Sequence, residues 1–391
     1  MIKIVDLGMH PFADTFIGAD QLHLSEPAYP LECFLNKETG EIKLGTQTQA
    51  HDRYTSYNYS YTSSNSKFSR NHWDEYSKSV SSKIKLPKNS QIVEVGSNDG
   101  YLSRQFKNLG YKVLGIDPSQ YMADLALKEG VETHVDLFCL KSSEIIKERL
   151  GKVDLIVANN VFNHTNDVHD FTSAVSSLLK DDGTFVYELP YWYNTIKDQR
   201  FDQIYHEHVT YFTAKFSYEL LKAHGFQIVD IEVVNYHGGS LRVFAKKTRS
   251  TKLANCLKKL IDQEKSLGLF EENTYKNFMD ALHTKRNLFL KQICDLRLKS
   301  IPVIGVGAAA KGNTFLNFYN LDNSMLDYVT DSSPHKQGKY TPLTRIPIVG
   351  DEIFAEYSDV YALILSWNIA NSLKNALHSI NNKIKFLELP K

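Results

Sequence analysis

The sequence predicts an α/β protein with two separate regions in which strands and helices alternate. These regions cover residues 91–247 and 301–391, and in each of them apolar runs of strand length are followed by amphipathic helical segments. This alternation is typical of doubly wound sheets. A chain of 391 residues is long enough for two or three domains, and we expect them at 1–80, 81–249 and 250–391.

Each element expected in the first region follows from its local pattern. Apolar runs predict strands, whereas apolar residues at helical spacing, followed by a glycine such as Gly130 or Gly183, predict helices that end there. The expected strands are 91–96, 112–117, 131–138, 152–160, 183–190, 227–234 and 240–247. The expected helices are 101–110, 122–130, 167–182 and one around 214–224.

Helical spacing continues through residues 251–299, where we expect two helices that lead to the last domain. The second region then begins with a strand and a glycine turn at 301–307 and a helix at 308–319, and further strands follow at 326–331 and 361–367. Residues 1–80 do not show this alternation. Their Tyr-, Ser- and Asn-rich tract at 55–72 has the composition of a linker, but its aromatic side chains favour packing or binding.

The charge balance limits the classes of partner. The chain has 45 basic and 45 acidic residues, so it has no overall field for nucleic acid or an anionic membrane, and local groups must hold any anionic ligand. We find no signal-peptide pattern and no apolar run long enough to span a membrane. Four widely spaced cysteines are typical of a reducing cytoplasm. We expect a cytoplasmic monomer or small homo-oligomer without nucleic-acid or membrane partners.

A nucleotide-containing cofactor is predicted at the first strand of the 91–247 region. The sequence E-V-G-S-N-D-G starts at Glu94, includes Gly96, Asn98 and Gly100, ends this strand and opens a helix. Glycines let the backbone approach a ligand, and a helix N-terminus offers free N–H groups. Asp117 ends the second strand, where a carboxylate can bind both hydroxyls of a ribose. These features alone allow either NAD or S-adenosylmethionine.

Further positions at strand ends favour S-adenosylmethionine. The spacing E-x-G-x-x-x-G resembles motif I of class I methyltransferases rather than the dinucleotide pattern G-x-G-x-x-G. Asp136 and Leu137 resemble the pair that brackets adenine, and Asn159 ends the fourth strand, where it faces the methionine portion. Ligands of open sheets bind outside the carboxyl ends of the strands, so these positions are in the correct order for one site.

The segment from Phe201 to His208 carries the densest chemistry in the chain. Tyr205, His206, Glu207 and His208 follow the fifth strand, and such groups support proton transfer near neutral pH. Alkylation of a carbon beside a ketone needs a base for the α-proton and donors for the enolate oxygen. A metal site is the rival interpretation, but the spacing is not H-E-x-x-H and no cysteine lies nearby, so we expect no metal.

His237 lies in a second cluster, Y-H-G-G-S-L-R, between the last two strands of this region. We consider two interpretations of it. The imidazole either caps a neighbouring group in a turn or lies in the substrate cleft.

Four segments make the chain resemble the nucleotide-sugar C-methyltransferases of antibiotic and surface-glycan pathways. They are FDQIYHEHVTYFT at 201–213, HGGSLRVFA at 237–245, GVGAAAKGNTFLN at 305–317, and residues 331–342, which read S-P-H-K-Q-G-K-Y-T-P from Ser333 onward. This family has a small N-terminal zinc domain, a central class I methyltransferase domain and a C-terminal Rossmann-like domain, with the active site between the last two. Its best-known type methylates C3 of a thymidine-diphosphate 4-keto-6-deoxy sugar.

The resemblance implies roles for individual residues. His208 aligns with the proposed base, Tyr205 and Glu207 align with its neighbours, and Asn160 aligns with a polar residue near the sugar. Tyr59 or Tyr61 aligns with an N-terminal tyrosine that reaches the same cleft.

The N-terminal region departs from the family in its cysteines. Family members carry C-x-x-C pairs here, whereas this chain has Cys33 alone, and one thiolate cannot complete a tetrahedral zinc site. We therefore expect an irregular domain that has lost its zinc and is held by packing.

The turn G-V-G-A-A-A at 305–310 imitates a dinucleotide-binding turn and, taken alone, suggests NADPH. In the family, however, this domain helps to bind the nucleotide of the acceptor. The resemblance therefore implies that Lys311, Asn313, Lys336 and Lys339 bind substrate, with the lysines facing a diphosphate.

The sequence as a whole predicts an S-adenosylmethionine-dependent sugar C-methyltransferase. Its expected substrate is a nucleotide-diphosphate sugar with a 4-keto group. We expect the methyl group to be added to C3 through an enolate. Two alternatives remain at this point: methylation of a sugar hydroxyl, and a bifunctional enzyme that also binds NADPH and reduces the ketone.

Overall fold

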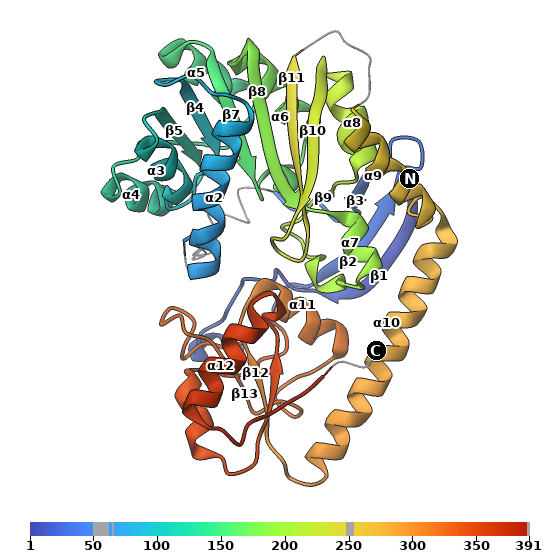
Figure 1. Cartoon of the computed structure of the whole chain (residues 1–391). Helices are drawn as coiled ribbons and strands as arrows, with labels where there is room; N and C mark the ends of the chain where they lie inside the picture. The colour runs from blue at the N-terminus through green and yellow to red at the C-terminus, as the bar shows by residue number, and fades with distance from the viewer. Residues whose placement is uncertain (50–61, 65, 248–253, 389–391) are drawn as a thin grey trace.

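The computed structural model describes residues 1–49, 62–64, 66–247 and 254–388, and it contains three sheets. Figure 1 shows the central sheet in the upper part of the molecule and the C-terminal sheet in the lower part. Helix α10 (Glu272–Arg297) runs along one side and joins the two parts.

The central sheet has seven strands in the order β10-β11-β8-β7-β4-β5-β6. The strands β4, β5, β6, β7 and β8 are parallel, whereas β11 is antiparallel to both β8 and β10. Their bounds are β4 (Gln91–Val95), β5 (Lys112–Asp117), β6 (Thr133–Val135), β7 (Val153–Asn159), β8 (Leu179–Pro190), β10 (Phe226–Val234) and β11 (Ser240–Lys247). The chain order reverses between β4 and β7, and such a switch point is where open sheets bind ligands.

Helices cover both faces of this sheet. They are α2 (Lys67–Lys83), α3 (Tyr101–Asn108), α4 (Gln120–Lys128), α5 (Leu140–Leu150), α6 (Val168–Leu178) and α8 (Ala214–Ala223). Side-chain caps fix several of their starts: Ser119 accepts from the Met122 N–H on α4, and Thr213 accepts from the Phe216 N–H on α8. Trp73 and Tyr76 bury α2 against the same sheet, so this helix packs with the central part.

One boundary differs from its prediction. The helix expected to continue to residue 182 ends at Leu178, and β8 begins at the next residue. Leu179 is paired with Val153 of β7, so strand pairing overrides the helical pattern there.

The N-terminal sheet has the order β1-β2-β3-β9 and is antiparallel throughout. Its strands are β1 (Ile2–His10), β2 (Tyr29–Leu35), β3 (Ile42–Leu44) and the short β9 (Thr210–Tyr211), which closely follows the segment from Phe201 to His208. Cys33 is fully buried in its core, and burial raises the pKa of that thiol. Among the described residues, no group of three or more His, Cys, Asp or Glu side chains is placed to hold a metal ion.

The C-terminal sheet is parallel, with the order β14-β13-β12-β15-β16. Its strands are β12 (Val303–Val306), β13 (Tyr328–Thr330), β14 (Ile348–Val349), β15 (Tyr361–Ile364) and β16 (Lys385–Phe386), and its helices are α11 (Ala310–Tyr319) and α12 (Ala370–Ile380). Helix α9 (Asn255–Ser266) precedes α10 and is anchored by Glu264. The Glu264 carboxylate accepts from the Tyr191 hydroxyl at 2.8 Å and from the first backbone N–H groups of α8.

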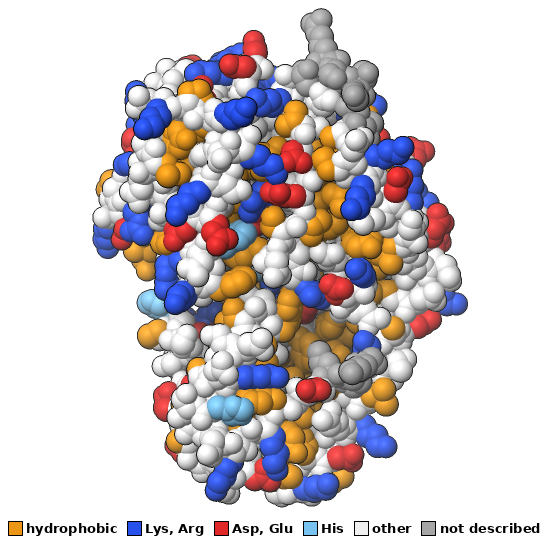
Figure 2. Space-filling model, in the orientation of Figure 1, with side chains coloured by type: hydrophobic (Ala, Val, Ile, Leu, Met, Phe, Trp, Pro, Cys, Tyr) orange, Lys and Arg blue, Asp and Glu red, His pale blue; other side chains and the backbone are white. Residues whose placement is uncertain are grey.

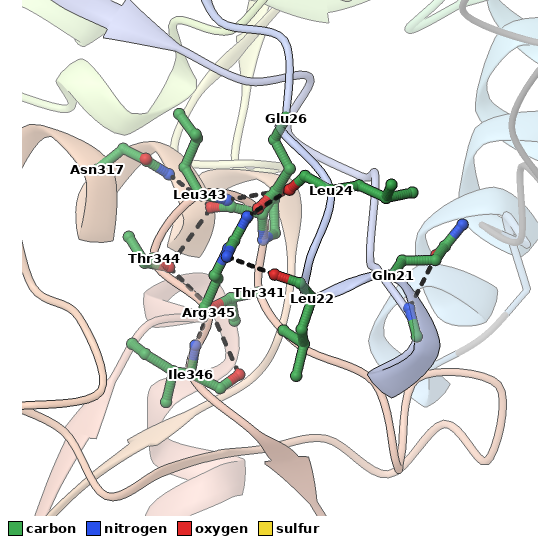
Figure 3. A network of polar contacts seen from close by, with 12 residues as sticks. Gln21, Leu22, Leu24, Glu26, Asn317, Thr341, Leu343, Thr344, Arg345 and Ile346 are labelled. Atoms are coloured by element: carbon green, nitrogen blue, oxygen red, sulfur yellow. Dashed lines mark hydrogen bonds and ion pairs between the residues drawn. The ribbon is translucent and has the colours of Figure 1, made fainter.

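Residues 11–28, which connect β1 to β2, form a strap that crosses to the C-terminal part. Ile17 pairs with Tyr340, and the Asn313 side chain donates to the Ala13 carbonyl. Arg345 donates to the carbonyls of Leu22 and Leu24 and to Glu26, as Figure 3 shows. A single hydrophobic core therefore runs from the N-terminal sheet through α10 into the C-terminal part.

Two features concern the surroundings of the protein: the hydrophobic side chains on its surface and the length and hydropathy of its helices. Hydrophobic side chains line the junction between the upper and lower parts on the face drawn in Figure 2. Within the described ranges, no helix combines the length and the apolar character needed to cross a membrane.

Candidate active site

A cavity of about 330 Å³ opens at the carboxyl ends of β4, β5 and β7. Pockets for small molecules and cofactors usually have volumes of roughly 300–1,000 Å³. Six residues expected to bind the cofactor line it: Gly96, Asn98, Asp117, Asp136, Leu137 and Asn159. The strands therefore bring together positions that are up to 63 residues apart in the sequence.

The glycine turn forms one wall of this cavity. Gly96 has a φ of +69°, and a Cβ on it would lie 2.9 Å from the Val161 side chain, so a larger residue is excluded twice over. Gly100 is the N-cap of α3, and a Cβ there would lie 2.8 Å from Ala126. Gly100 thus lets α3 pack closely and does not itself line the cavity.

Glu94 is buried behind the turn and does not line the cavity. Its carboxylate accepts from the Ser103 hydroxyl of α3 at 2.5 Å, and burial raises the pKa of Glu94 to about 8. The contact fixes α3 against β4, so Glu94 shapes the turn from beneath.

Asp117 is in place to bind the hydroxyls of a ribose. Its two carboxylate oxygens accept from the backbone N–H groups of Asn98 at 2.9 Å and Ser119 at 3.0 Å. Burial raises the pKa of Asp117. Each oxygen keeps further acceptor capacity, since an ionised carboxylate has about four lone-pair sites.

An unsatisfied polar group indicates that the cavity accepts a polar ligand. Within the part of the chain that the structure describes, the Oδ1 of Asn160 is buried without a hydrogen-bond partner, and the neighbouring Asn159 side chain interacts with the Tyr76 hydroxyl. Asn160 also has a φ of +52°, which is an uncommon conformation for a residue with a side chain. The amino-acid portion of S-adenosylmethionine carries groups that satisfy amides of this kind, so the residues fit that cofactor.

His208 is held in the neutral form that a base requires. Its Nδ1 donates to the Gln203 carbonyl at 2.8 Å, which leaves the lone pair on Nε2. Burial, together with the nearby charge of Lys311, lowers the pKa of His208 to about 3. The Tyr205 ring lies against the imidazole, with ring centroids 4.0 Å apart.

His164 lies next to His208 and reaches the cofactor cavity. Its imidazole lines the cavity, and its ring centroid lies 5.1 Å from that of His208. His164 was not predicted, because it stands alone in the 3-10 turn Phe162–His164 after β7 and belongs to no dense motif. Its place four residues after Asn160, at the same strand end, was the available signal.

The other two residues of the 205–208 segment are placed differently. His206 points into the N-terminal sheet, where its ring lies edge-on to Phe12 and Tyr29 and its Nε2 lies 3.3 Å from the Pro30 carbonyl. The structure therefore does not bring His206 to His208. Glu207 is partly buried, and its charge acts on the pKa of Tyr211.

Lys311 reaches the same region from the C-terminal part. Its Nζ lies 3.5 Å from Nδ1 of His237 and 5.0 Å from the centre of the Trp367 ring. Burial lowers the pKa of Lys311 to about 8 and holds the pKa of His237 well below its ordinary value. His237 and Lys311, which lie 74 residues apart, therefore meet His208 at one place.

Three further residues complete this junction and were not predicted. Trp367 donates from Nε1 to Asp202 at 2.5 Å, and the Arg200 guanidinium lies 4.5 Å from the centre of the Trp367 ring. Arg200 also donates to the Gly238 carbonyl at 2.5 Å. Trp367 is isolated in the sequence, so its contact with Asp202 in the 201–208 segment could be recognised only from the fold.

The remaining residues expected to bind substrate either contact other parts of the protein or lie outside the junction. Asn313 is 1% exposed and holds the strap through Ala13. Lys336 donates to the Ala308 carbonyl at 2.6 Å and lies over the Phe16 ring, so it packs the strap onto the C-terminal turn. Lys339 is partly exposed in the loop that precedes β14. Tyr59 and Tyr61 lie outside the described residues.

Two known families match this chain. Residues 70–231 match a methyltransferase domain, and residues 235–388 match the C-methyltransferase C-terminal domain. Over 99% of its length, the chain is 30% identical to the C-methyltransferase NovU of Streptomyces niveus, and the match covers 90% of that protein.

More distant matches cover less of the chain. A stretch of 105 residues, 27% of this chain, is 30% identical to a ubiquinone biosynthesis O-methyltransferase of Pelagibacter ubique and covers 43% of it. Among solved structures, the magnesium protoporphyrin IX methyltransferase of Synechocystis PCC 6803 with bound S-adenosylmethionine is 15% identical. That match has a TM-score of 0.35 and covers 46% of this chain and 79% of that one.

Proposed function

This chain belongs to the C-methyltransferase family and uses S-adenosylmethionine as its methyl donor, and on that premise we propose that its acceptor is a nucleotide-linked 4-keto deoxy sugar. The methyl group is transferred to a ring carbon next to the ketone, which we take to be C3. The product is a branched sugar.

The observation that carries this proposal is the meeting of His208 and Lys311 beside the cofactor cavity. Lys311 lies in the first turn of α11, where the helix dipole disfavours a cation. The charge of Asp202 stabilises this ammonium group, but the Asp202 carboxylate also accepts from Trp367. Burial of the ammonium group still costs stability, and a diphosphate would offset that cost.

The proposed mechanism assigns proton removal to His208. Its Nε2 accepts the proton next to the ketone, and Tyr205 and Asn160 hold the sugar and the developing enolate oxygen. S-adenosylmethionine, when bound, supplies an electrophilic methyl group, for which Asp117 holds the ribose and Asp136 and Leu137 bracket the adenine. The closed junction between the two parts orients the sugar carbon and excludes water.

We also propose that the C-terminal domain serves the acceptor rather than a nicotinamide cofactor. Its turn at 305–310 is covered by the strap, through Asn313 bound to Ala13 and Lys336 packed on Phe16. Asp331, at the position that binds ribose in dinucleotide folds, already accepts from Ala308 and Ser333. The three domains of the proposal are 1–80, 81–249 and 250–391, with α2 packed on the second.

The test is incubation with S-adenosylmethionine and a panel of dTDP- and GDP-linked 4-keto sugars in deuterated water. Mass spectrometry reports methyl gain in the product and deuterium uptake in the substrate that remains. Because the methyl group replaces the exchangeable hydrogen of the ring carbon, we expect deuterium next to the ketone in recovered substrate and methyl gain in the product. Methyl gain without any exchange at that carbon would instead support methylation of a hydroxyl. Loss of the ketone upon addition of NADPH would support the bifunctional alternative.

A further inference from the structure

We propose that Asp99 is a positioning residue that couples methyl-donor binding to the N-terminal segment at Ser63 and Ser64. The inference depends on the methyl donor and not on the identity of the acceptor. It concerns the residue between Asn98 and Gly100 in the glycine turn, which the proposed mechanism does not use.

The carboxylate of Asp99 is filled by donors from this segment. Its Oδ1 accepts from the Ser63 hydroxyl at 2.5 Å and from the Tyr101 N–H at 3.3 Å. Its Oδ2 accepts from the Ser64 N–H at 3.2 Å and the Ser64 hydroxyl at 2.5 Å. Four donors match the roughly four lone-pair sites of an ionised carboxylate, so the contact is fully formed.

Asn98 extends this contact to the cofactor cavity, which it lines. Its Oδ1 accepts from the Ser63 N–H at 2.8 Å, and its own backbone N–H donates to Asp117 at 2.9 Å. Its φ of +49° is held by these contacts on both sides. Ser63 is therefore connected through Asn98 to the carboxylate that is in place to bind the ribose.

The chain is held at the cavity on the other side of residues 50–61 as well. Gln49 lines the cavity, and the Asn166 side chain, which also lines it, donates to the Thr48 carbonyl at 2.9 Å. Lys43 donates to the Asn166 carbonyl at 3.4 Å. The described residues on both flanks of 50–61 are thus fixed by groups that line the cofactor cavity.

Reciprocity follows from this arrangement. If the segment stabilises the turn in its binding geometry, then a bound cofactor must stabilise the segment by the same factor. Loss of hydrogen bonds to a buried carboxylate is expected to weaken cofactor binding by about tenfold.

The test compares Asp99→Asn with the double variant Ser63→Ala/Ser64→Ala. Asn has the shape of Asp but replaces an acceptor oxygen with a donor, and the serine variant removes both hydroxyls while Asp99 stays. Titration calorimetry with S-adenosylhomocysteine measures affinity, and hydrogen exchange of residues 62–70 is followed with and without this probe. We expect both variants to bind about tenfold more weakly, and their combination to add little further.

The hydrogen-exchange measurement separates coupling from a merely structural role. In the wild type, S-adenosylhomocysteine should protect the amides of residues 62–70, and this protection should be lost in both variants. Asp74→Asn is the control, since Asp74 accepts from the Tyr101 hydroxyl at 3.1 Å without contacting either serine, and it should behave like the wild type.

Two results would overturn the proposal. One is wild-type affinity and protection in the serine variant while Asp99→Asn binds weakly, because Asp99 would then act on the turn alone. The other is unchanged binding in both. If Asp99→Asn does not fold, the serine variant decides alone. None of these measurements needs an acceptor, so a wrong sugar assignment leaves their outcome unaffected.

Discussion

At the scale of single residues, the site combines two groups that burial holds in unusual protonation states. His208 is neutral well below its ordinary pKa, and Lys311 has a pKa of about 8 in a place where a helix N-terminus also disfavours its charge. Perturbed pKa values of this kind cluster at functional sites, because catalysis and binding require side chains in protonation states that burial and neighbouring charges create.

Substitution of His208 by Asn tests its role as the base. The side chain keeps a similar shape but cannot accept the proton, so methyl transfer should fall by about 10²- to 10⁴-fold. Affinity for S-adenosylhomocysteine should stay within twofold, measured by calorimetry. His206→Asn is the comparison, because His206 packs on the N-terminal sheet and its loss should lower stability more than turnover. Turnover of His208→Asn at the wild-type rate would remove it as the base.

The lowered pKa of Lys311 predicts that acceptor binding depends on pH. The ammonium is charged below its pKa of about 8, so the acceptor KM should be constant below that pH and rise above it by up to about tenfold per pH unit. Lys311→Met should raise KM and abolish this rise. Lys374→Met is the control, since that lysine also lies over an aromatic ring, that of Phe386. A wild-type KM that is flat from pH 7 to 10 would contradict the role.

The residues that line the cofactor cavity were the easiest to predict, because each lies at a strand end or within three residues after it. Gly96, Asn98, Asp117, Asp136 and Asn159 need only the strand order to meet. Arg200, Asp202 and Trp367 were missed, since their contacts depend on how the two parts of the molecule pack. His206 illustrates the opposite limit: it belongs to the predicted 205–208 segment, but its ring packs against Phe12 and Tyr29.

At the scale of elements, the predicted class I methyltransferase fold is confirmed. Counted along the chain, the central sheet has the order 3-2-1-4-5-7-6, with the seventh strand antiparallel. Strands such as β4 and β7 are largely buried on both faces and thus read as apolar runs, whereas β6 and β10 are only partly buried. Strand β9 escaped prediction, since two residues, Thr210 and Tyr211, form it only by pairing with β3.

The strap is the element that sequence patterns could not show. Its residues contact partners more than 300 positions away, such as Glu26 with Arg345. Arg345 and Leu343 both have positive φ, and this uncommon backbone is held by the strap contacts.

Arg345→Ala tests the strap as a structural link. It removes a contact to Glu26 and two hydrogen bonds to backbone carbonyls, so the free energy of unfolding should fall by about 1–3 kcal/mol, measured in urea. Lys385→Ala removes an exposed pair with Asp359 and should leave the urea midpoint almost unchanged, because surface ion pairs add little stability. Equal effects of the two variants would show that the strap adds no more stability than a surface pair.

At the scale of the whole molecule, two Rossmann-like parts are joined so that the residues proposed to bind the acceptor come together from both parts at one junction. The central sheet supplies the methyl-donor cavity and His208, and the C-terminal part supplies Lys311 and Trp367. The continuous core through α10 and the strap fix their relative position. Mutual placement of this kind has no signature in local sequence patterns, and here the family resemblance supplied the expectation.

The most direct test of the central claim is a crystal structure with S-adenosylhomocysteine and the nucleotide-sugar acceptor bound together. We expect the sulfur in the cavity between Gly96 and Asn160, the diphosphate at Lys311, and the reacting carbon between the sulfur and Nε2 of His208. A sugar ring bound away from residues 205–208, or a diphosphate on another surface, would contradict it.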